Sequence, residues 1–178
     1  VCDGMGGVHG GNIASGLGVK VFSAVIRNTF GKNPEAGRDS RSLQHILNTA
    51  VAEANSAIYS RAAGDTELDG MGTTLVAAWL SRDLAVVINV GDSRAYHFTR
   101  EDVRLITRDH SLDAYMVERG ELTQEQAKLH PGKNVITRAV GTEPEVEGDV
   151  FTCRLRRDEC ILLCSDGLSN EMADQEML

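Results

Sequence analysis

The chain has 178 residues, 42% of them hydrophobic, and its 26 acidic and 18 basic residues give a formal net charge of −8. This length supports one substantial core and is short for two, so residues 1–178 are predicted to form a single domain. The acidic balance, without any cluster of Lys and Arg, argues against a nucleic-acid-binding protein.

Neither a membrane segment nor a disulfide framework is predicted. No apolar run approaches the roughly 20 residues that cross a bilayer. The four cysteines form no C-x-x-C pair, and three of them lie in or beside apolar runs, which is typical of reduced thiols. The sequence therefore favours a cytoplasmic protein.

The first part of the chain predicts two amphipathic helices. Apolar residues recur at helical spacing over residues 12–30, and Asn12 is a candidate N-cap. The stretch GKNPEAGRDS at 31–40 breaks this pattern, and a second apolar stripe then runs from Leu43 to Ile58.

From Thr73 onward the pattern changes to short β-rich runs separated by turns, which predicts an antiparallel meander. Residues 111–133 are polar and weakly helical and predict a surface excursion that could act as a flap. Strands resume at 150–155 and 160–165, and a helix is expected to begin near Glu171. Because helices and strands are grouped, the predicted class is α+β, with helices covering antiparallel sheet.

Three apolar runs each end in an aspartate beside a glycine: VCDGMGG at 1–7, VVINVGDSRAY at 86–96 and CILLCSDGLSN at 160–170. One such pair is most simply a β-turn. Three of them predict that Asp3, Asp92 and Asp166 project from the rims of strands toward a common point. Ligands that are all oxygen suit Mg²⁺ or Mn²⁺ better than Zn²⁺.

Two such cations can hold a phosphate, lower the pKa of a bound water and stabilise charge during in-line attack, so no protein nucleophile is needed. Two rival interpretations are weaker. The run GMGGVHGG lacks the strand and glycine spacing of a dinucleotide loop. A cysteine phosphatase needs an arginine six positions after its cysteine, and Cys164 has Asn170 there.

The chain resembles the metal-dependent Ser/Thr protein phosphatases of type 2C, the PPM family, and especially its bacterial branch. The motifs that carry the resemblance are DGMGG at 3–7, GMGTTLVAAWL at 70–80, NVGDSRAY at 89–96, LITRDHSL at 105–112, NVITRAVG at 134–141 and LLCSDGLSN at 162–170. The resemblance implies a β-sandwich of two antiparallel sheets flanked by helices on both faces, with a dinuclear Mn²⁺ or Mg²⁺ centre at one end.

The resemblance also implies roles for single residues. Asp3 matches the carboxylate that bridges both cations, the Gly4 carbonyl matches a ligand to one of them, and Asp166 matches the ligand of the other. Asp92 matches an acid that helps to hold a weaker third cation. Its usual partner is an aspartate, but position 170 is Asn170, whose amide oxygen brings no charge.

Two departures from the family pattern leave alternatives open. Met5 stands where some members have a histidine proposed as general acid. An N-terminal strand with a phosphate-binding arginine and an acidic residue, and a C-terminal Asp-Asn motif, are expected outside residues 1–178. The activity implied is hydrolysis of phosphoserine and phosphothreonine in proteins by metal-activated water. The alternatives are a catalytically degraded binding or regulatory domain and a stage II sporulation E type of regulator phosphatase.

The implied partners are phosphoprotein substrates and a cognate Ser/Thr kinase, and a monomer is expected. Supporting roles are also predicted near the acids. Thr73 and Thr74 are expected to support Asp3 or Asp166 from behind, Arg94 to pair with a nearby acid, and His110 to serve as a hydrogen-bonding group in a loop.

Overall fold

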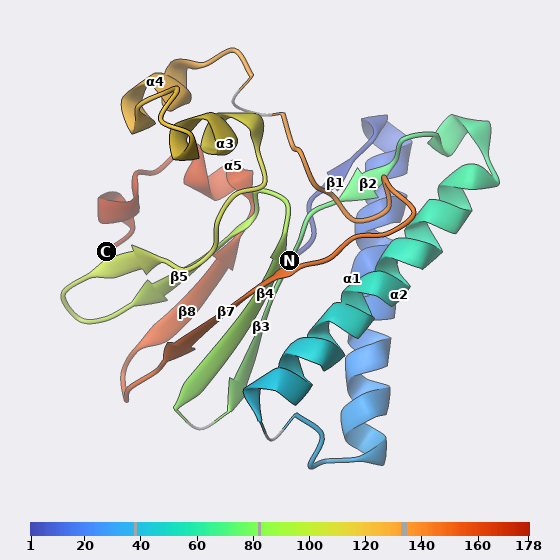
Figure 1. Cartoon of the computed structure of the whole chain (residues 1–178), viewed down its shortest axis with the longest axis horizontal. Helices are drawn as coiled ribbons and strands as arrows, with labels where there is room; N and C mark the ends of the chain where they lie inside the picture. The colour runs from blue at the N-terminus through green and yellow to red at the C-terminus, as the bar shows by residue number, and fades with distance from the viewer. Residues whose placement is uncertain (38, 82, 133–134) are drawn as a thin grey trace.

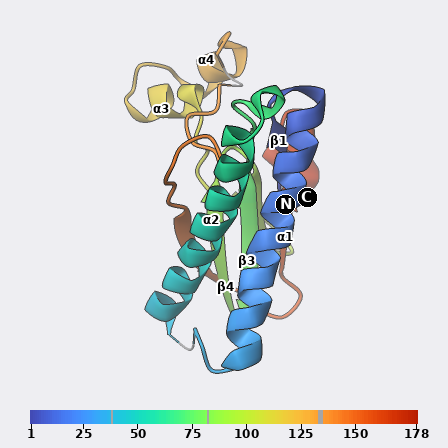
Figure 2. The same ribbon diagram turned by 90° about the vertical axis from the view of Figure 1, so that its right-hand side faces the viewer.

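Two long helices lie side by side and form one layer of the molecule (Figures 1 and 2). The computed structural model describes residues 1–37, 39–81, 83–132 and 135–178. Helix α1 spans Gly7–Lys32 and α2 spans Ser40–Ala63. The Asp39 side chain caps α2 by accepting a hydrogen bond from the Ser42 amide at 2.9 Å.

Helix α1 begins earlier than predicted, and Asn12 lies inside it rather than at its N-cap. The N-cap is Gly6, whose φ of 111° favours glycine. The glycines of the first turns let the helix approach neighbouring backbone closely, since a Cβ at Gly11 would lie 2.7 Å from the Gly4 carbonyl oxygen. The glycine-rich run is therefore a contact surface of a helix, which its composition does not reveal.

Two three-stranded antiparallel sheets form the centre of the molecule. The first has the order β3-β4-β7 and the second the order β6-β5-β8. A separate pair, β1 with β2, joins the N-terminal segment to the start of the meander. The strands are β1 Gly4–Met5, β2 Gly72–Thr73, β3 Leu75–Ser81, β4 Leu84–Val90, β5 Arg94–Phe98, β6 Val103–Leu105, β7 Asp149–Arg154 and β8 Cys160–Cys164.

The core follows the two-residue period of the strands. On β4, Val86 and Ile88 face the helix layer, where they cluster with Val51 and Ile58 of α2. Val87, which has the opposite parity, packs between the sheets with Ala95 of β5. The two-sheet sandwich that the resemblance implies is confirmed, with α1 and α2 over the first sheet (Figure 2).

The remaining helices are short. On the outer face of the second sheet, Leu168 and Met177 pack against the cluster of Tyr96, Val103 and Cys164. These two residues belong to α5, Asp166–Ser169, and to the 3₁₀ helix η2, Asp174–Met177. The other short helices are η1 Thr66–Leu68, α3 Leu112–Glu118 and α4 Gln124–Leu129.

The predicted excursion at 111–133 is thus helical, as expected. The helix expected near Glu171 was wrong, because α5 starts directly after β8 with Ser165 at its N-cap position. Four predicted features each include a residue outside those described. They are the loop at 31–40, one of the turns between the predicted strands, at 81–83, the end of the excursion at 111–133, and the motif at 134–141. Among the described residues, no helix is long and apolar enough to span a membrane.

Candidate active site

Asp3 is held through its backbone by two threonines from the start of the meander. The Asp3 amide donates to Thr74 Oγ1 at 2.9 Å, and the Asp3 carbonyl accepts from the Thr74 amide at 2.8 Å and from Thr73 Oγ1 at 2.9 Å. Thr74 Oγ1 also lies 2.7 Å from Ser93 Oγ. The predicted support by Thr73 and Thr74 is confirmed for Asp3, and it reaches the loop that carries Asp92.

Asp92 follows β4 in a tight turn that is fixed on two sides. The preceding Gly91 has a φ of 103°, and a Cβ there would lie 2.7 Å from Thr74 Cγ2. The His110 ring accepts a hydrogen bond from the Gly91 amide through Nδ1 at 3.0 Å, and the buried Asn89 side chain donates to the Gly91 carbonyl at 3.1 Å. The predicted role of His110 as a hydrogen-bonding group is confirmed.

Asp166 is the first residue of α5, immediately beyond the end of β8. The Asn170 side chain, one turn further on, donates through Nδ2 to Asp166 Oδ2 at 3.3 Å. These two predicted site residues therefore lie at the two ends of one short helix, with Asn170 at its C-cap.

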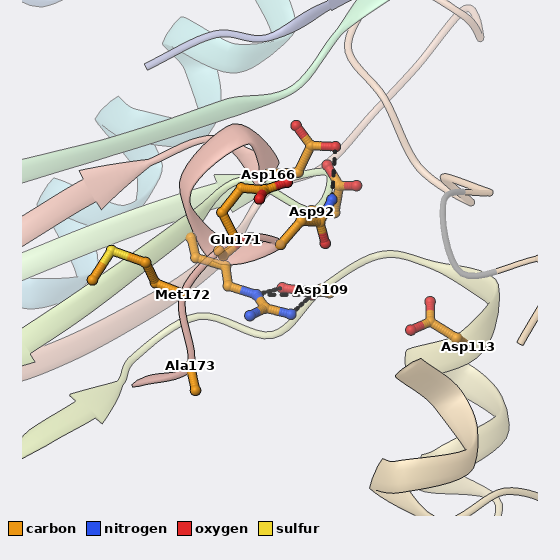
Figure 3. Close-up of a pocket in the computed structure, with 10 residues that line it drawn as sticks. Asp92, Asp109, Asp113, Asp166, Glu171, Met172 and Ala173 are labelled. Carbon is orange, nitrogen blue, oxygen red and sulfur yellow. Dashed lines mark hydrogen bonds and ion pairs between the residues drawn. The ribbon is translucent and has the colours of Figure 1, made fainter. Parts of the chain in front are cut away.

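A hollow of about 270 Å³ opens between these elements (Figure 3). Asp92 and Asp166 lie close together on one side of it, and Asp113 of α3 stands across from them. Arg94 also lines the hollow and donates to both carboxylate oxygens of Asp109, with its shortest contact at 2.7 Å. The prediction that Arg94 pairs with a nearby acid is confirmed.

The carboxylates repel one another, and this is visible in their proton affinity. Burial, together with the nearby charges of Asp166, Asp109 and Asp3, raises the pKa of Asp92 to about 6. Burial and the close approach of the Asp3 carboxylate likewise raise the pKa of Asp166 above its ordinary value. The site concentrates negative charge for which the described residues supply few cations, Arg94 being directed to Asp109.

This donor set fits a hard divalent cation. Asp3, Asp92 and Asp166 offer only oxygen, the ligand type that Mg²⁺ and Mn²⁺ favour, and a bound cation would relieve the repulsion that raises the pKa values. Among the described residues, no three His, Cys, Asp or Glu side chains converge closely enough to hold a cation by themselves. Backbone carbonyl and water oxygens would therefore have to complete the coordination.

Gly4 is placed differently from the carboxylates. It pairs with Thr73 in the small β1-β2 ladder, and its carbonyl oxygen lies against the backbone of α1 at Gly11. A Cβ at Gly4 would come within 1.9 Å of the Gly11 carbonyl oxygen, so this contact requires a glycine. A role of the Gly4 carbonyl as a ligand stays a prediction.

Sequence reasoning missed two acids of the hollow, Asp109 and Asp113. Asp109 lies in the motif LITRDHSL, but nothing in its spacing shows that it meets Arg94, fifteen positions earlier. Asp113 stands in the first turn of α3, where an acidic residue is common at any helix start and carries no signal for a site.

Known proteins resemble this chain over almost its whole length. A family model described as protein phosphatase 2C matches residues 1–178. The chain is 38% identical over 177 residues to the serine/threonine phosphatase stp of Listeria innocua, an alignment that covers 99% of this chain and 68% of that protein.

Solved structures agree with this match. The serine/threonine phosphatase PstP/Ppp of Mycobacterium tuberculosis superposes with a TM-score of 0.86 at 34% identity, covering 99% of this chain and 71% of the other. A structure of the PstP catalytic domain in complex with two manganese ions superposes with a TM-score of 0.80 at 33% identity, covering 98% and 69%.

Proposed function

We propose, since this chain belongs to the protein phosphatase 2C family, that it hydrolyses phosphoserine and phosphothreonine in proteins. The observation that carries the proposal is that the carboxylates of Asp3, Asp92 and Asp166 lie near enough to repel one another, at a hollow that Asp92 and Asp166 line. The names of the relatives, serine/threonine phosphatases, support the same reaction.

Asp3 and Asp166 are the residues that we infer hold the two cations, with the Gly4 carbonyl as a further ligand. Bound Mn²⁺ or Mg²⁺ supplies Lewis acidity, which activates water and offsets the charge of the phosphoryl group. The chain supplies the positions of the carboxylates: Thr73 and Thr74 fix Asp3, and α5 fixes Asp166.

Asp92 and Asn170 are inferred to form the weaker third cation site. Asp92 has the raised pKa of a carboxylate in a negative field, so a cation near it would be bound in exchange for a proton below pH 6. Asn170 already donates its amide hydrogen to Asp166, and its oxygen remains as a neutral acceptor. A neutral ligand lowers the expected affinity relative to an aspartate at that position.

Arg94 is inferred to position the site and not to clamp phosphate. Its guanidinium is already shared between Asp109 and the Tyr96 hydroxyl, at 2.7 and 3.2 Å. Tyr96 in turn donates to Asp174 Oδ1 at 3.0 Å, so the network links Arg94, in the lining of the hollow, to η2. A phosphate that competed for Arg94 would leave Asp109 unpaired beside Asp92.

We infer that the protein is a monomer of one domain. We also infer that it reverses the action of a Ser/Thr kinase, because the motifs GMGTT at 70–74 and GDSRAY at 91–96 resemble those of the kinase-paired bacterial phosphatases. Light scattering on an eluting size-exclusion peak tests the monomer.

The test of the proposed function is hydrolysis of p-nitrophenyl phosphate and of a phosphothreonine peptide against a Mn²⁺ titration. Asp3→Asn and Asp166→Asn are expected to abolish turnover while leaving the protein folded. Asp69→Asn is the matched control, since Asp69 also precedes a glycine but is exposed beside η1, away from the hollow. Folded protein with no turnover at any Mn²⁺ or Mg²⁺ concentration would overturn the proposal and favour a binding domain.

A further inference from the structure

A second hollow, of about 780 Å³, lies at the end of the sandwich opposite to the candidate active site. Strand β8 runs between the two: Asp166 lies two positions beyond its last residue, and the turn at 155–159 precedes its first (Figure 1). At about 3.3 Å per residue, five residues separate the two ends by roughly 17 Å. Four arginines line this hollow, Arg104, Arg154, Arg156 and Arg157, and we name it the arginine groove. Its lining also contains His97, Thr99, Leu155 and two carboxylates, Asp83 and Glu159.

The arginines come from segments that the fold brings together. Arg104 lies on β6, directly opposite His97 of β5 in the ladder register. Arg154 is the last residue of β7, and Arg156 and Arg157 follow in the turn to β8. Strands β6 and β7 are each the edge of a sheet, so the groove lies where the two sheets end beside unpaired backbone.

The four arginines outnumber the two carboxylates that line the groove, Asp83 and Glu159. Glu159 is already engaged, since its Oε2 lies 2.9 Å from His97 Nε2 and accepts from the Arg156 amide at 2.9 Å. Asp158, in the same turn, pairs with Arg100 at 2.8 Å. Among the described residues, no carboxylate forms an ion pair with the guanidinium of any of the four arginines of the groove.

This arrangement is unusual in a chain of net charge −8. Like charges held together in a concave site repel one another, and an anionic ligand offsets that repulsion. An extended polyanion, such as a membrane surface or a polynucleotide, would also meet the negative charge of the rest of the molecule. A short acidic peptide meets only the groove, and the adjacent strand edges can bind its backbone.

We propose that the arginine groove binds an acidic segment of the phosphoprotein substrate, away from the phosphoryl group that is hydrolysed. This inference rests on the proposed function, because the hydrolase activity is what makes a phosphoprotein the partner. Carboxylate or additional phosphoryl groups of the segment would be held by the four guanidinium groups, which suit planar and tetrahedral oxyanions through paired N–H donors.

Binding alone is tested with fluorescein-labelled hexaglutamate by fluorescence anisotropy. Arg154→Glu combined with Arg157→Glu is expected to weaken binding about tenfold or more, because charge reversal turns attraction into repulsion. Arg27→Glu combined with Arg41→Glu is the matched control, with the same change of net charge at exposed positions of α1 and α2. Equal affinity of the two double variants would overturn the proposal.

The kinetic test separates this inference from the proposed function. For a phosphothreonine peptide extended by an acidic segment, the groove variant should raise KM about tenfold and leave kcat unchanged, while turnover of p-nitrophenyl phosphate stays unchanged. Loss of all turnover in the unaltered protein would contradict the proposed function, yet anisotropy would still test the groove.

Two further probes decide the nature of the ligand. In the anisotropy assay, millimolar inorganic phosphate is added in one experiment and vesicles of phosphatidylcholine with phosphatidylserine in another, and the displacement of the labelled peptide is measured. Weak competition by both supports an acidic peptide as the ligand. Displacement by vesicles at low lipid concentration would overturn the choice of a protein segment in favour of a membrane surface, and complete displacement by low phosphate would do so in favour of a free oxyanion.

Discussion

The His110 ring and the Gly91 amide form a hydrogen bond of 3.0 Å through Nδ1, and the His110 amide returns a second bond of 3.0 Å to the Gly91 carbonyl. His110 is only 6% exposed, and burial lowers its pKa, so the ring is neutral and its Nδ1 is free to accept. Its Nε2 lies 3.1 Å from Asp149 Oδ2. His110, which is itself paired with Asp149, therefore holds the turn that carries Asp92.

Replacing the His110 ring should show how much its hydrogen bond to the Gly91 amide contributes to the free energy of unfolding. His110→Phe keeps an aromatic ring but leaves the Gly91 amide buried without an acceptor, which should lower the free energy of unfolding by about 1–3 kcal/mol. Urea denaturation followed by circular dichroism gives the value. His45→Phe, at an exposed position of α2, is the control, and an equal loss in both variants would contradict the role given to the ring.

The Thr74 hydroxyl should matter for metal affinity as well as for stability. Thr74→Val removes the acceptor for the Asp3 amide and the partner of Ser93 Oγ without a large change in volume. We expect Mn²⁺ affinity to fall roughly 10–100-fold, as is typical when support behind a metal ligand is lost. Isothermal titration calorimetry measures this, and Thr74→Ser, which keeps the hydroxyl, should stay near the original affinity.

Asn55 should prove to be a structural residue of α2. It is 1% exposed, its Oδ1 accepts from the Gly141 amide at 2.6 Å, and its Nδ2 donates to the Glu143 and Pro144 carbonyls at 3.0 and 3.2 Å. Asn55→Leu leaves these backbone groups unpaired and should cost about 2–3 kcal/mol of unfolding free energy. Thermal denaturation measures this loss, with Thr49→Ala, on the exposed side of the same helix, as the control. Equal melting temperatures of the two variants would refute the structural role of Asn55.

The stability of the metal-free protein should depend on pH through Asp92. Its pKa rises from 3.8 to about 6 on folding, so between these values the native state binds more protons than the unfolded state. The free energy of unfolding therefore falls as pH rises from about 4 to 6, by about 1–2 kcal/mol once solvent screening is allowed for. Denaturation in EDTA at several pH values measures the slope.

Asp92→Asn provides the comparison for that experiment, because it removes the titrating group. The difference in unfolding free energy between the two proteins should grow across this pH interval, with the variant more stable at the upper end. Saturating Mn²⁺ should reduce the difference, since a cation offsets the repulsion among the carboxylates. A difference that is constant with pH would contradict the raised pKa.

The antiparallel strands and the approach of the three acids were predictable from local patterns, whereas the two-sheet sandwich was implied by the family resemblance. Strand alternation and an aspartate beside a glycine are visible within a few residues. The position of Asn12 inside α1 was not predictable, because the start of that helix is set by contacts of glycine backbone with Gly4 and Met71. Asp109 was missed for the same reason, since its role depends on Arg94, which only the tertiary structure brings near.

The hydrogen bond between the Asp3 amide and Thr74 spans 71 positions of the chain, and Asp166 joins them from near the C-terminal end. During synthesis on the ribosome, Asp3 emerges long before either partner, so its carboxylate is not positioned until almost the whole of this region has been made. Contacts of such separation form late in folding, because a large loop must first be closed. Tight cation binding should therefore require that segments from three distant parts of the chain have already been brought together.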